Sequence, residues 1–128
     1  MGGAGTTPNG EGRANARLVL RRPALITLLD ETRIDGWTVD LSYGGICVRT
    51  EVRLRLTQYC AVRFAVTFDD ALQTVLALGQ VAYSEPEPEL ESPGGFRSGI
   101  QFIKVDHASE QAIDRLLREA APHSPPDL

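Results

Sequence analysis

A two-residue hydrophobic repeat constrains the fold of this 128-residue chain more than any other feature. In "CAVRFAVTF" (60–68), large apolar side chains alternate with small or polar ones. Because successive side chains of a strand point to opposite faces, this pattern predicts a strand with one buried face. The residues predicted on that face are Val62, Phe64, Val66 and Phe68.

Similar strand patterns, separated by turn residues, recur along most of the chain. Apolar and β-forming residues at 17–30 predict a strand with an edge or bulge near Pro23. Asp35-Gly36 predicts the turn of a hairpin, with "WTVDLS" as its return strand. Later strands are predicted for "GICVRT", for "LQTVLALGQVAYSE" after a turn at "DDA", and for "GFRSGIQFIKV".

Only the C-terminal part changes to helical spacing. Asp106 is the predicted N-cap of a helix that Pro122 ends. About six antiparallel strands followed by one amphipathic helix predict a mainly β fold, a small barrel with the helix packed on it. The apolar stripe of the helix consists of Ala112, Ile113, Leu116, Leu117 and Ala120.

The size and termini predict one domain. A chain of 13.9 kDa can form one hydrophobic core but not two. Residues 1–12 and 122–128 have little to bury, so we expect disordered tails around a domain at 13–121. No apolar run approaches the ~18 residues of a membrane-spanning helix. The start lacks the apolar core of a signal peptide, so we expect a cytoplasmic protein without membrane insertion.

Charge is unevenly distributed. The net charge of −4 argues against binding to a nucleic-acid polymer. "RANARLVLRR" (13–22) nevertheless holds four arginines and no acid, which suits one small anionic ligand. The acidic "EPEPELE" (85–91) is expected to form a solvated, stiff loop. Cys47 and Cys60 lie in apolar segments and are expected to be buried, reduced thiols.

The stretch "DLSYGG" (40–45) ends a predicted strand in small polar residues. Alternation places Leu41 on the core face, so Asp40 and Ser42 project together from the opposite face with Thr38 behind them. One interpretation is a local turn in which these side chains bond nearby backbone. The other is a polar shelf that binds a ligand.

Two glycines complete this stretch. Gly44 and Gly45 can take positive φ and bring bare backbone close to a ligand. An enzymatic role lacks support, because only His107 and His123 could serve Ser42 as a base and the GxSxG pattern is absent. No metal-ligand spacing or GK[ST] phosphate loop occurs, so we expect no metal or cofactor.

Arg13 and Arg17 form an RxxxR pattern just before the first predicted strand. Taken alone, it fits a solvated basic patch. The planar fork of arginine also matches phosphate oxygens or the O6/N7 edge of guanine. A carboxylate such as Asp40 complements the N1–H and amino donors on the other guanine edge. The combination suits a guanine nucleotide.

In this order, "RANAR" (13–17) and "DLSYGG" (40–45) resemble the RxxxR and [D/N]xSxxG motifs of the PilZ domain family. "WTVDLSYGGICV", "GQVAYSE" and "GFRSGIQFIKVDHASEQAIDRLL" are similar to later parts of that family, so the resemblance covers about residues 13–121. It implies a six-stranded antiparallel β-barrel and binding of the bacterial second messenger cyclic di-GMP.

The resemblance also implies residue roles. Arg13 and Arg17 would grip the phosphates and the guanine edges or faces. Asp40 and Ser42 would hydrogen-bond a guanine, and Gly45 would leave room for the base.

Two further positions bear on how the ligand binds. Tyr83 falls near an aromatic position of the family, where it would pack on a base. Gly12 stands where members that bind a stacked nucleotide pair often have another arginine. This favours one bound molecule, unless Arg21 or Arg22 compensates.

The resulting expectation is a non-enzymatic cyclic di-GMP receptor. Its N-terminal arm would fold over the nucleotide, and an unidentified partner protein would read the change. The alternative is a PilZ-like adaptor that binds a protein and no nucleotide. An exposed apolar patch, on the free face of the helix or at Leu54 and Leu56, would distinguish it.

Overall fold

The structure is a computed structural model that describes residues 16–87 and 95–120. The predicted tails and Arg13 lie outside the described residues. Within them, no helix is both long and apolar enough to cross a membrane. The elements are β1 (Arg17–Val19), β2 (Pro23–Leu28), β3 (Arg33–Ser42), β4 (Gly45–Thr50), β5 (Tyr59–Phe68), β6 (Ala71–Pro86), β7 (Phe96–Val105) and α3 (His107–Ala120).

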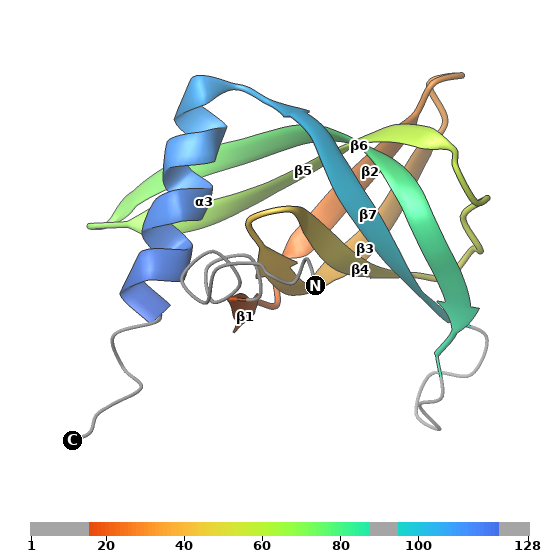
Figure 1. The fold of residues 1–128 in the computed structure, drawn as a ribbon, viewed down its shortest axis with the longest axis horizontal. Helices are drawn as coiled ribbons and strands as arrows, with labels where there is room; N and C mark the ends of the chain where they lie inside the picture. Colours follow the sequence, from red (N-terminus) through yellow and green to blue (C-terminus); the bar gives the residue numbers. More distant parts are fainter. Residues whose placement is uncertain (1–15, 88–94, 121–128) are drawn as a thin grey trace, which may run out of the picture.

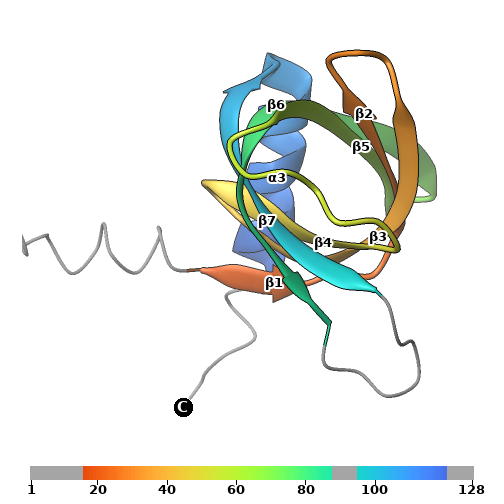
Figure 2. The ribbon, with the colours of Figure 1, turned by 90° about the vertical axis from the view of Figure 1, so that its right-hand side faces the viewer.

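Six of the strands close into an antiparallel barrel, which confirms the predicted fold class. Around the ring their order is β3-β2-β5-β6-β7-β4, and β4 pairs back with β3. The short β1 is a seventh strand outside this ring. β2 pairs with the first half of β3, and β1 pairs with its second half, so β1 runs beside the end of the barrel wall (Figure 2).

The first hairpin turns at 29–32, before the position predicted for it. Asp35-Gly36 lies inside β3, so the turn prediction there is wrong. At the actual turn, the N–H of Leu28 donates to the carbonyl of Thr32 at 2.9 Å, and Glu31 has a φ of 73°. Gly36 is needed for another reason: a Cβ there would collide with the carbonyl oxygen of Arg49 on β4.

The barrel core follows the two-residue repeat. Val62, Phe64 and Val66 of β5 are buried, as predicted. The hairpin from β5 to β6 turns at Asp69 and Asp70, which both have positive φ. Buried side chains from other strands complete the core; they include Ala24, Ile26, Leu41, Ile46, Val48, Val75, Val81 and Ile100.

Alternation fails at one position of β3. The β3–β4 register shifts between Thr38 and Asp40, which leaves Val39 without a partner on β4. Thr38 is consequently buried, and its hydroxyl accepts the N–H of Arg22 at 2.8 Å. The prediction that Thr38 lies on the outward face behind Asp40 is therefore wrong.

The helix α3 lies across one end of the barrel (Figures 1 and 2). Asp106 is its N-cap, as predicted, because its Oδ1 accepts the N–H of Ser109 at 2.7 Å. Ala112, Ile113 and Leu117 are buried against the barrel core. The apolar face of α3 is thus used by the fold itself.

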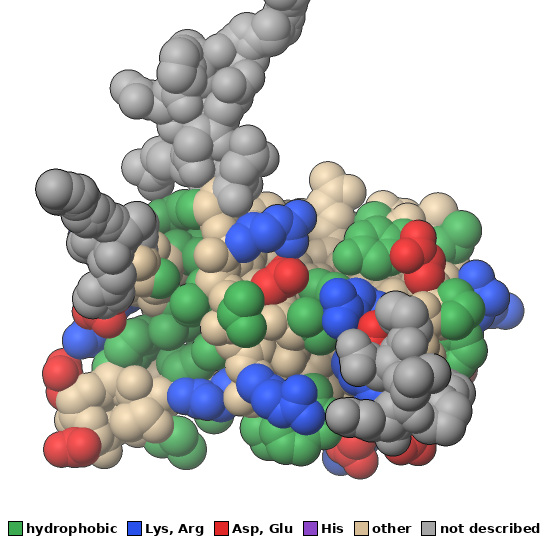
Figure 3. Space-filling view, turned by 90° about the horizontal axis from the view of Figure 1, so that it is seen from below, with side chains coloured by type: hydrophobic (Ala, Val, Ile, Leu, Met, Phe, Trp, Pro, Cys, Tyr) green, Lys and Arg blue, Asp and Glu red, His purple; other side chains and the backbone are tan. Residues whose placement is uncertain are grey.

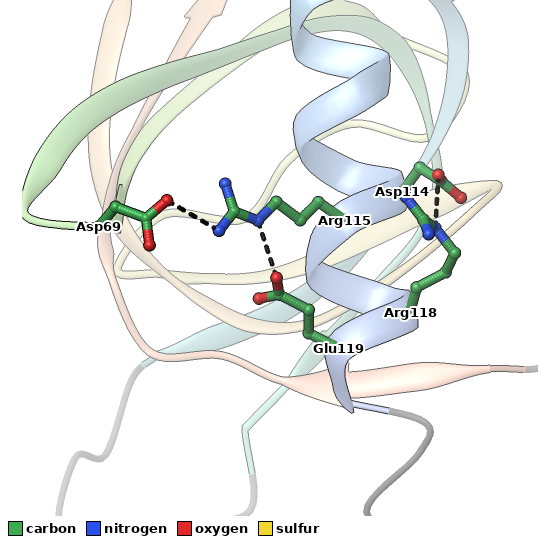
Figure 4. A network of polar contacts seen from close by, with 5 residues as sticks. All are labelled: Asp69, Asp114, Arg115, Arg118 and Glu119. Carbon is green, nitrogen blue, oxygen red and sulfur yellow. Dashed lines mark hydrogen bonds and ion pairs between the residues drawn. The ribbon is translucent and has the colours of Figure 1, made fainter.

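Among the described residues, one ion pair joins α3 to the β5–β6 hairpin (Figure 4). The guanidinium of Arg115 contacts Asp69 at 3.2 Å and Glu119 at 2.8 Å, and it stacks 4.2 Å from the ring centre of Phe68. Such exposed pairs contribute little stability individually. The Asp69 ion pair and the Phe68 ring contact together hold the hairpin tip against the helix.

The acidic segment 85–91 differs from its prediction where it is described. β6 continues through Pro86, and the following Glu87 is buried. Its Oε2 contacts Arg97 at 3.1 Å and Arg49 at 3.7 Å. The expected solvated loop is therefore wrong for Glu87, since two arginines compensate its charge.

Candidate functional site

The predicted site residues that the structure describes all line one hollow of about 240 Å³ beside β1. It lies over the β3–β4 turn and the adjoining parts of β6 and β7. Figure 3 shows this side of the molecule, with arginine or lysine side chains next to acidic ones. The predicted residues in the lining are Arg17, Asp40, Ser42, Gly44, Gly45 and Tyr83.

Arg17 and Asp40 form an ion pair across this hollow. β1 places Arg17 opposite Ser42 and Val19 opposite Asp40. The Nη1 of Arg17 donates to Oδ1 of Asp40 at 2.9 Å. Arg17 therefore belongs to a paired strand rather than to a loose arm. Its side chain remains 66% exposed, so most of the guanidinium faces solvent.

Ser42 combines a local and an outward role. Its hydroxyl donates to the carbonyl of Gly45 at 3.2 Å. The local-turn interpretation thus describes Ser42, whereas Asp40 pairs with a residue 23 positions away. A hydroxyl has two acceptor lone pairs, so Ser42 can still accept a hydrogen bond from a ligand in the hollow.

The two glycines serve different purposes, and neither has a positive φ. A Cβ on Gly45 would lie 2.5 Å from the carbonyl oxygen of Ile100, so β4 and β7 can approach only with glycine there. A Cβ on Gly44 would have no atom within 4 Å, so this position faces open space. The predicted left-handed backbone is therefore wrong for both.

Tyr83 forms one wall of the hollow. Its ring packs directly over Gly99, where any Cβ would collide with it. Its hydroxyl donates to the Sγ of Cys47 at 3.7 Å. Burial, reinforced by this bond, raises the pKa of Tyr83 to about 12, so the phenol keeps its proton at neutral pH.

Sequence reasoning missed several lining residues. Gly99 and Gln101 come from β7, and Cys47 comes from β4. The glycine inside "FRSGIQF" was a usable signal, because glycine within a strand marks close approach of another group. Cys47 and Cys60 are free and buried, as predicted, and burial raises the pKa of both thiols.

A larger hollow of about 470 Å³ lies elsewhere, along β3 and β4. Trp37, Arg33 and Arg49 line it together with the acids Asp35 and Glu51. It contains none of the predicted residues, and its charges largely balance. Size alone therefore does not identify the site, and the smaller hollow has the convergent polar groups. Over 16–87 and 95–120, no cluster of three or more potential ligands could hold a metal ion.

The barrel, its terminal helix and this polar hollow define a β-barrel domain with a polar site on its surface. The sequence matches the PilZ domain over residues 11–119, which is most of the chain. The chain belongs to the PilZ domain family. None of the curated proteins compared with it matches.

Solved structures with the same fold include PilZ proteins at low sequence identity. The PilZ domain of YcgR from Escherichia coli with c-di-GMP is 16% identical, with a TM-score of 0.59 over 84% of this chain and 93% of that one. PlzA of Borreliella burgdorferi in complex with c-di-GMP is 6% identical, with a TM-score of 0.55 over 93% and 57%.

A third similar structure is the inhibitor of motility MotI/DgrA from Bacillus subtilis. It is 12% identical, with a TM-score of 0.72 over 86% of this chain and 51% of that one. This chain therefore spans only about half the length of MotI.

Proposed function

We propose that this protein is a non-enzymatic receptor for cyclic di-GMP. The observation that carries the proposal is the convergence of an arginine fork, a carboxylate, a hydroxyl and an aromatic ring on one hollow of a PilZ domain. YcgR and PlzA, which share the fold, were solved with c-di-GMP. The residues concerned are Arg17, Asp40, Ser42 and Tyr83.

Each group has a distinct role in this proposal. Asp40 accepts the N1–H and amino hydrogens of one guanine, and Ser42 adds a hydrogen bond beside it. Arg17 donates to a phosphate or to the O6/N7 edge of guanine, and the ring of Tyr83 packs on a base. Gly45 keeps the floor of the hollow free of side-chain atoms.

Arg13 completes the binding arm. Four residues of extended chain span at most about 14 Å, so Arg13 can reach the same hollow from the start of β1. Ordering of the arm at Arg13 over the ligand, next to the already paired Arg17, changes the shape and charge of this surface. A downstream protein, still to be identified, reads that change in the cytoplasm of a bacterium.

A second candidate function is a PilZ-like adaptor that binds a protein without nucleotide. The patches predicted for it are present only in part: Leu54 is buried and the apolar face of α3 packs on the barrel, whereas Leu56 is exposed. Another exposed apolar strip favours this alternative. It runs along the outer side of β6 to β7 and consists of Leu72, Leu76, Leu78 and Ile103.

Calorimetric titration distinguishes the two functions. We expect saturable heat when the protein is titrated with cyclic di-GMP and none with GTP, because GTP has only one guanine and lacks the ring of phosphates. Absence of heat with both nucleotides, together with unchanged amide chemical shifts around Arg17, would refute the receptor and leave the adaptor.

A further inference from the structure

The β5–β6 hairpin extends beyond the barrel as a two-stranded ribbon. β2 pairs with β5 only from Cys60 to Phe64, and β7 pairs with β6 only from Ala77 onward. Between these limits and the turn, β5 and β6 pair with each other. Figure 1 shows the tip of this ribbon reaching past α3. A two-stranded ribbon is marginally stable in water unless its faces pack on something else.

The helix α3 covers one face of the ribbon and leaves the other exposed. Val66 and Val75 on the inner face belong to the same buried cluster as the apolar residues of α3. The N–H of Leu76 donates to the hydroxyl of Ser109 on α3 at 2.9 Å. On the outer face, Leu72 is 75% exposed and Leu76 is 40% exposed. The fold thus uses the inner face alone.

The apolar strip continues from the ribbon onto the barrel wall. Leu78 is 46% exposed and Ile103 of β7 is 58% exposed. Small side chains of β5 lie beside the strip, because Ala65 pairs with Thr74 and Ala61 pairs with Leu78. Contiguous exposed apolar patches of this kind mark interaction surfaces.

Opposite charges lie at the two ends of the strip. Asp70 stands in the turn before β6, and Lys104 lies opposite Leu78 at the other end. Both residues are exposed. Among the residues that the structure describes, neither takes part in an ion pair. Both charges are therefore available to a partner.

This arrangement is complementary to itself. In a two-fold contact, the residue at one end of a surface meets the residue at the other end in the second copy. Thr74 lies midway along the chain between Asp70 and Leu78, the pairing partner of Lys104. A half-turn about Thr74 exchanges the two ends of the strip. The same rotation exchanges its sides, so Lys104 on the β7 side reaches the turn on the β5 side.

The remaining side chains fit the same rotation. It brings Leu72 of one copy over the region of Leu76 in the other, so leucines meet across the contact. Arg63 of β5 lies opposite Leu76, to one side of β6. The half-turn places the two copies of Arg63 on opposite sides of the interface, where they do not repel each other.

We propose that the apolar strip is the interface of a symmetric dimer of this chain. The leucines pack between the two β6 strands, and Asp70 of each copy pairs with Lys104 of the other. A second copy fits better than a different protein, because the strip carries both charges at complementary ends. This inference does not depend on the proposed function. If a second copy covers the strip, the strip no longer favours the adaptor.

Sedimentation equilibrium of the 128-residue chain tests this dimer. We expect a reversible monomer–dimer equilibrium with a dissociation constant of roughly micromolar size, because the outer faces of two strands form a small interface. Lys104→Glu should raise that constant at least about tenfold, since it places two acids together at both ends. Arg55→Glu is the matched control: it makes the same change in charge at an exposed position outside the strip and should leave the constant unchanged.

A charge exchange tests the pairing of the two ends. Asp70→Lys should weaken the dimer as Lys104→Glu does, and the double variant with both substitutions should restore it. Leu72→Ser tests the apolar contact and should also weaken the dimer. Its control is Leu29→Ser, because Leu29 is 78% exposed, close to the 75% of Leu72, and lies outside the strip. Thermal melts show whether each variant is folded, and Lys104→Glu and Leu72→Ser suffice if Asp70→Lys unfolds.

Three results would overturn the inference. A monomer at every concentration refutes the dimer and leaves the strip available to a different protein. A dimer that Lys104→Glu and Leu72→Ser weaken no more than their controls forms through another surface. A dimer that the charge exchange fails to restore refutes the pairing of Asp70 with Lys104. Titration with cyclic di-GMP decides the receptor function separately, so neither proposal fails with the other.

Discussion

Replacing Asp40 with alanine should weaken ligand binding far more than it weakens folding. The Asp40 side chain is 24% exposed, and its partner Arg17 is 66% exposed. Ion pairs exposed to this extent contribute about 0–1 kcal/mol to the free energy of unfolding. For a domain of this size, a loss of 1 kcal/mol lowers the melting temperature by about 4–8 °C, and we expect no larger shift.

Among the described residues that line the hollow, the same substitution removes the only carboxylate. Hydrogen bonds to a charged acceptor contribute about 1.5–3 kcal/mol. Calorimetric titration with cyclic di-GMP should therefore show affinity reduced by about tenfold to 150-fold. Urea denaturation of the same samples measures the change in stability.

Asp35→Ala is the matched control for Asp40→Ala. Asp35 lies on the same strand, is exposed, and lines the other hollow. The control loses the same charge and should bind with the affinity of the wild type. Equal affinities for the two variants would show that Asp40 does not contact the ligand, and a large loss of stability on replacing Asp40 would contradict the small contribution assigned to its ion pair.

Three further predictions concern other parts of the fold. Gly45→Ala should lower the free energy of unfolding by about 1–3 kcal/mol, because its Cβ would meet the backbone of β7, while Gly44→Ala should be nearly neutral; urea denaturation of both variants tests this difference. The pKa of Asp106 is lowered by hydrogen bonds from the backbone N–H and the side chain of Ser109, so its stabilising effect is present above the unfolded-state pKa and is lost as the pH falls through the lower folded-state value. Asp106→Asn keeps a cap without this titration, so the stability difference from the wild type should shrink from pH ~6 to pH ~3; a constant difference contradicts the assignment. Cys47 and Cys60 should resist a thiol reagent at neutral pH in the folded protein and react fully in denaturant; rapid reaction in the native state would show that the barrel opens at these strands.

The repeating parts of the fold were predictable from the sequence. Val62, Phe64 and Val66 alternate with other residues because one face of the strand packs on the core. This pattern identifies β5 directly. Asp106 and the apolar stripe after it likewise identify α3. These features depend on residues close together in the chain, and local spacing is what a sequence displays.

Features that depend on distant partners were not predictable. Gly36 looked like a turn, but it is glycine because β4 passes against its backbone. Thr38 looked outward-facing, but a register shift against β4 buries it. Glu87 looked solvated, but Arg49 and Arg97 from two other strands neutralise it.

The candidate site shows the same division. The polar residues of "DLSYGG" were predictable from strand alternation, and Tyr83 was predictable from the resemblance to the PilZ family. Two other features depend on how the strands assemble. β1 brings the Arg17 side chain to Asp40, and the ring of Tyr83 packs on Gly99.

Amide chemical-shift mapping during titration with cyclic di-GMP tests the central claim most directly, because it reports binding and location together. We predict saturable shifts at Arg17, from Asp40 to Gly45, at Tyr83 and around Gly99, with α3 unaffected. No shifts at saturating ligand, or shifts confined to surfaces outside the hollow, would contradict a cyclic di-GMP receptor of this design.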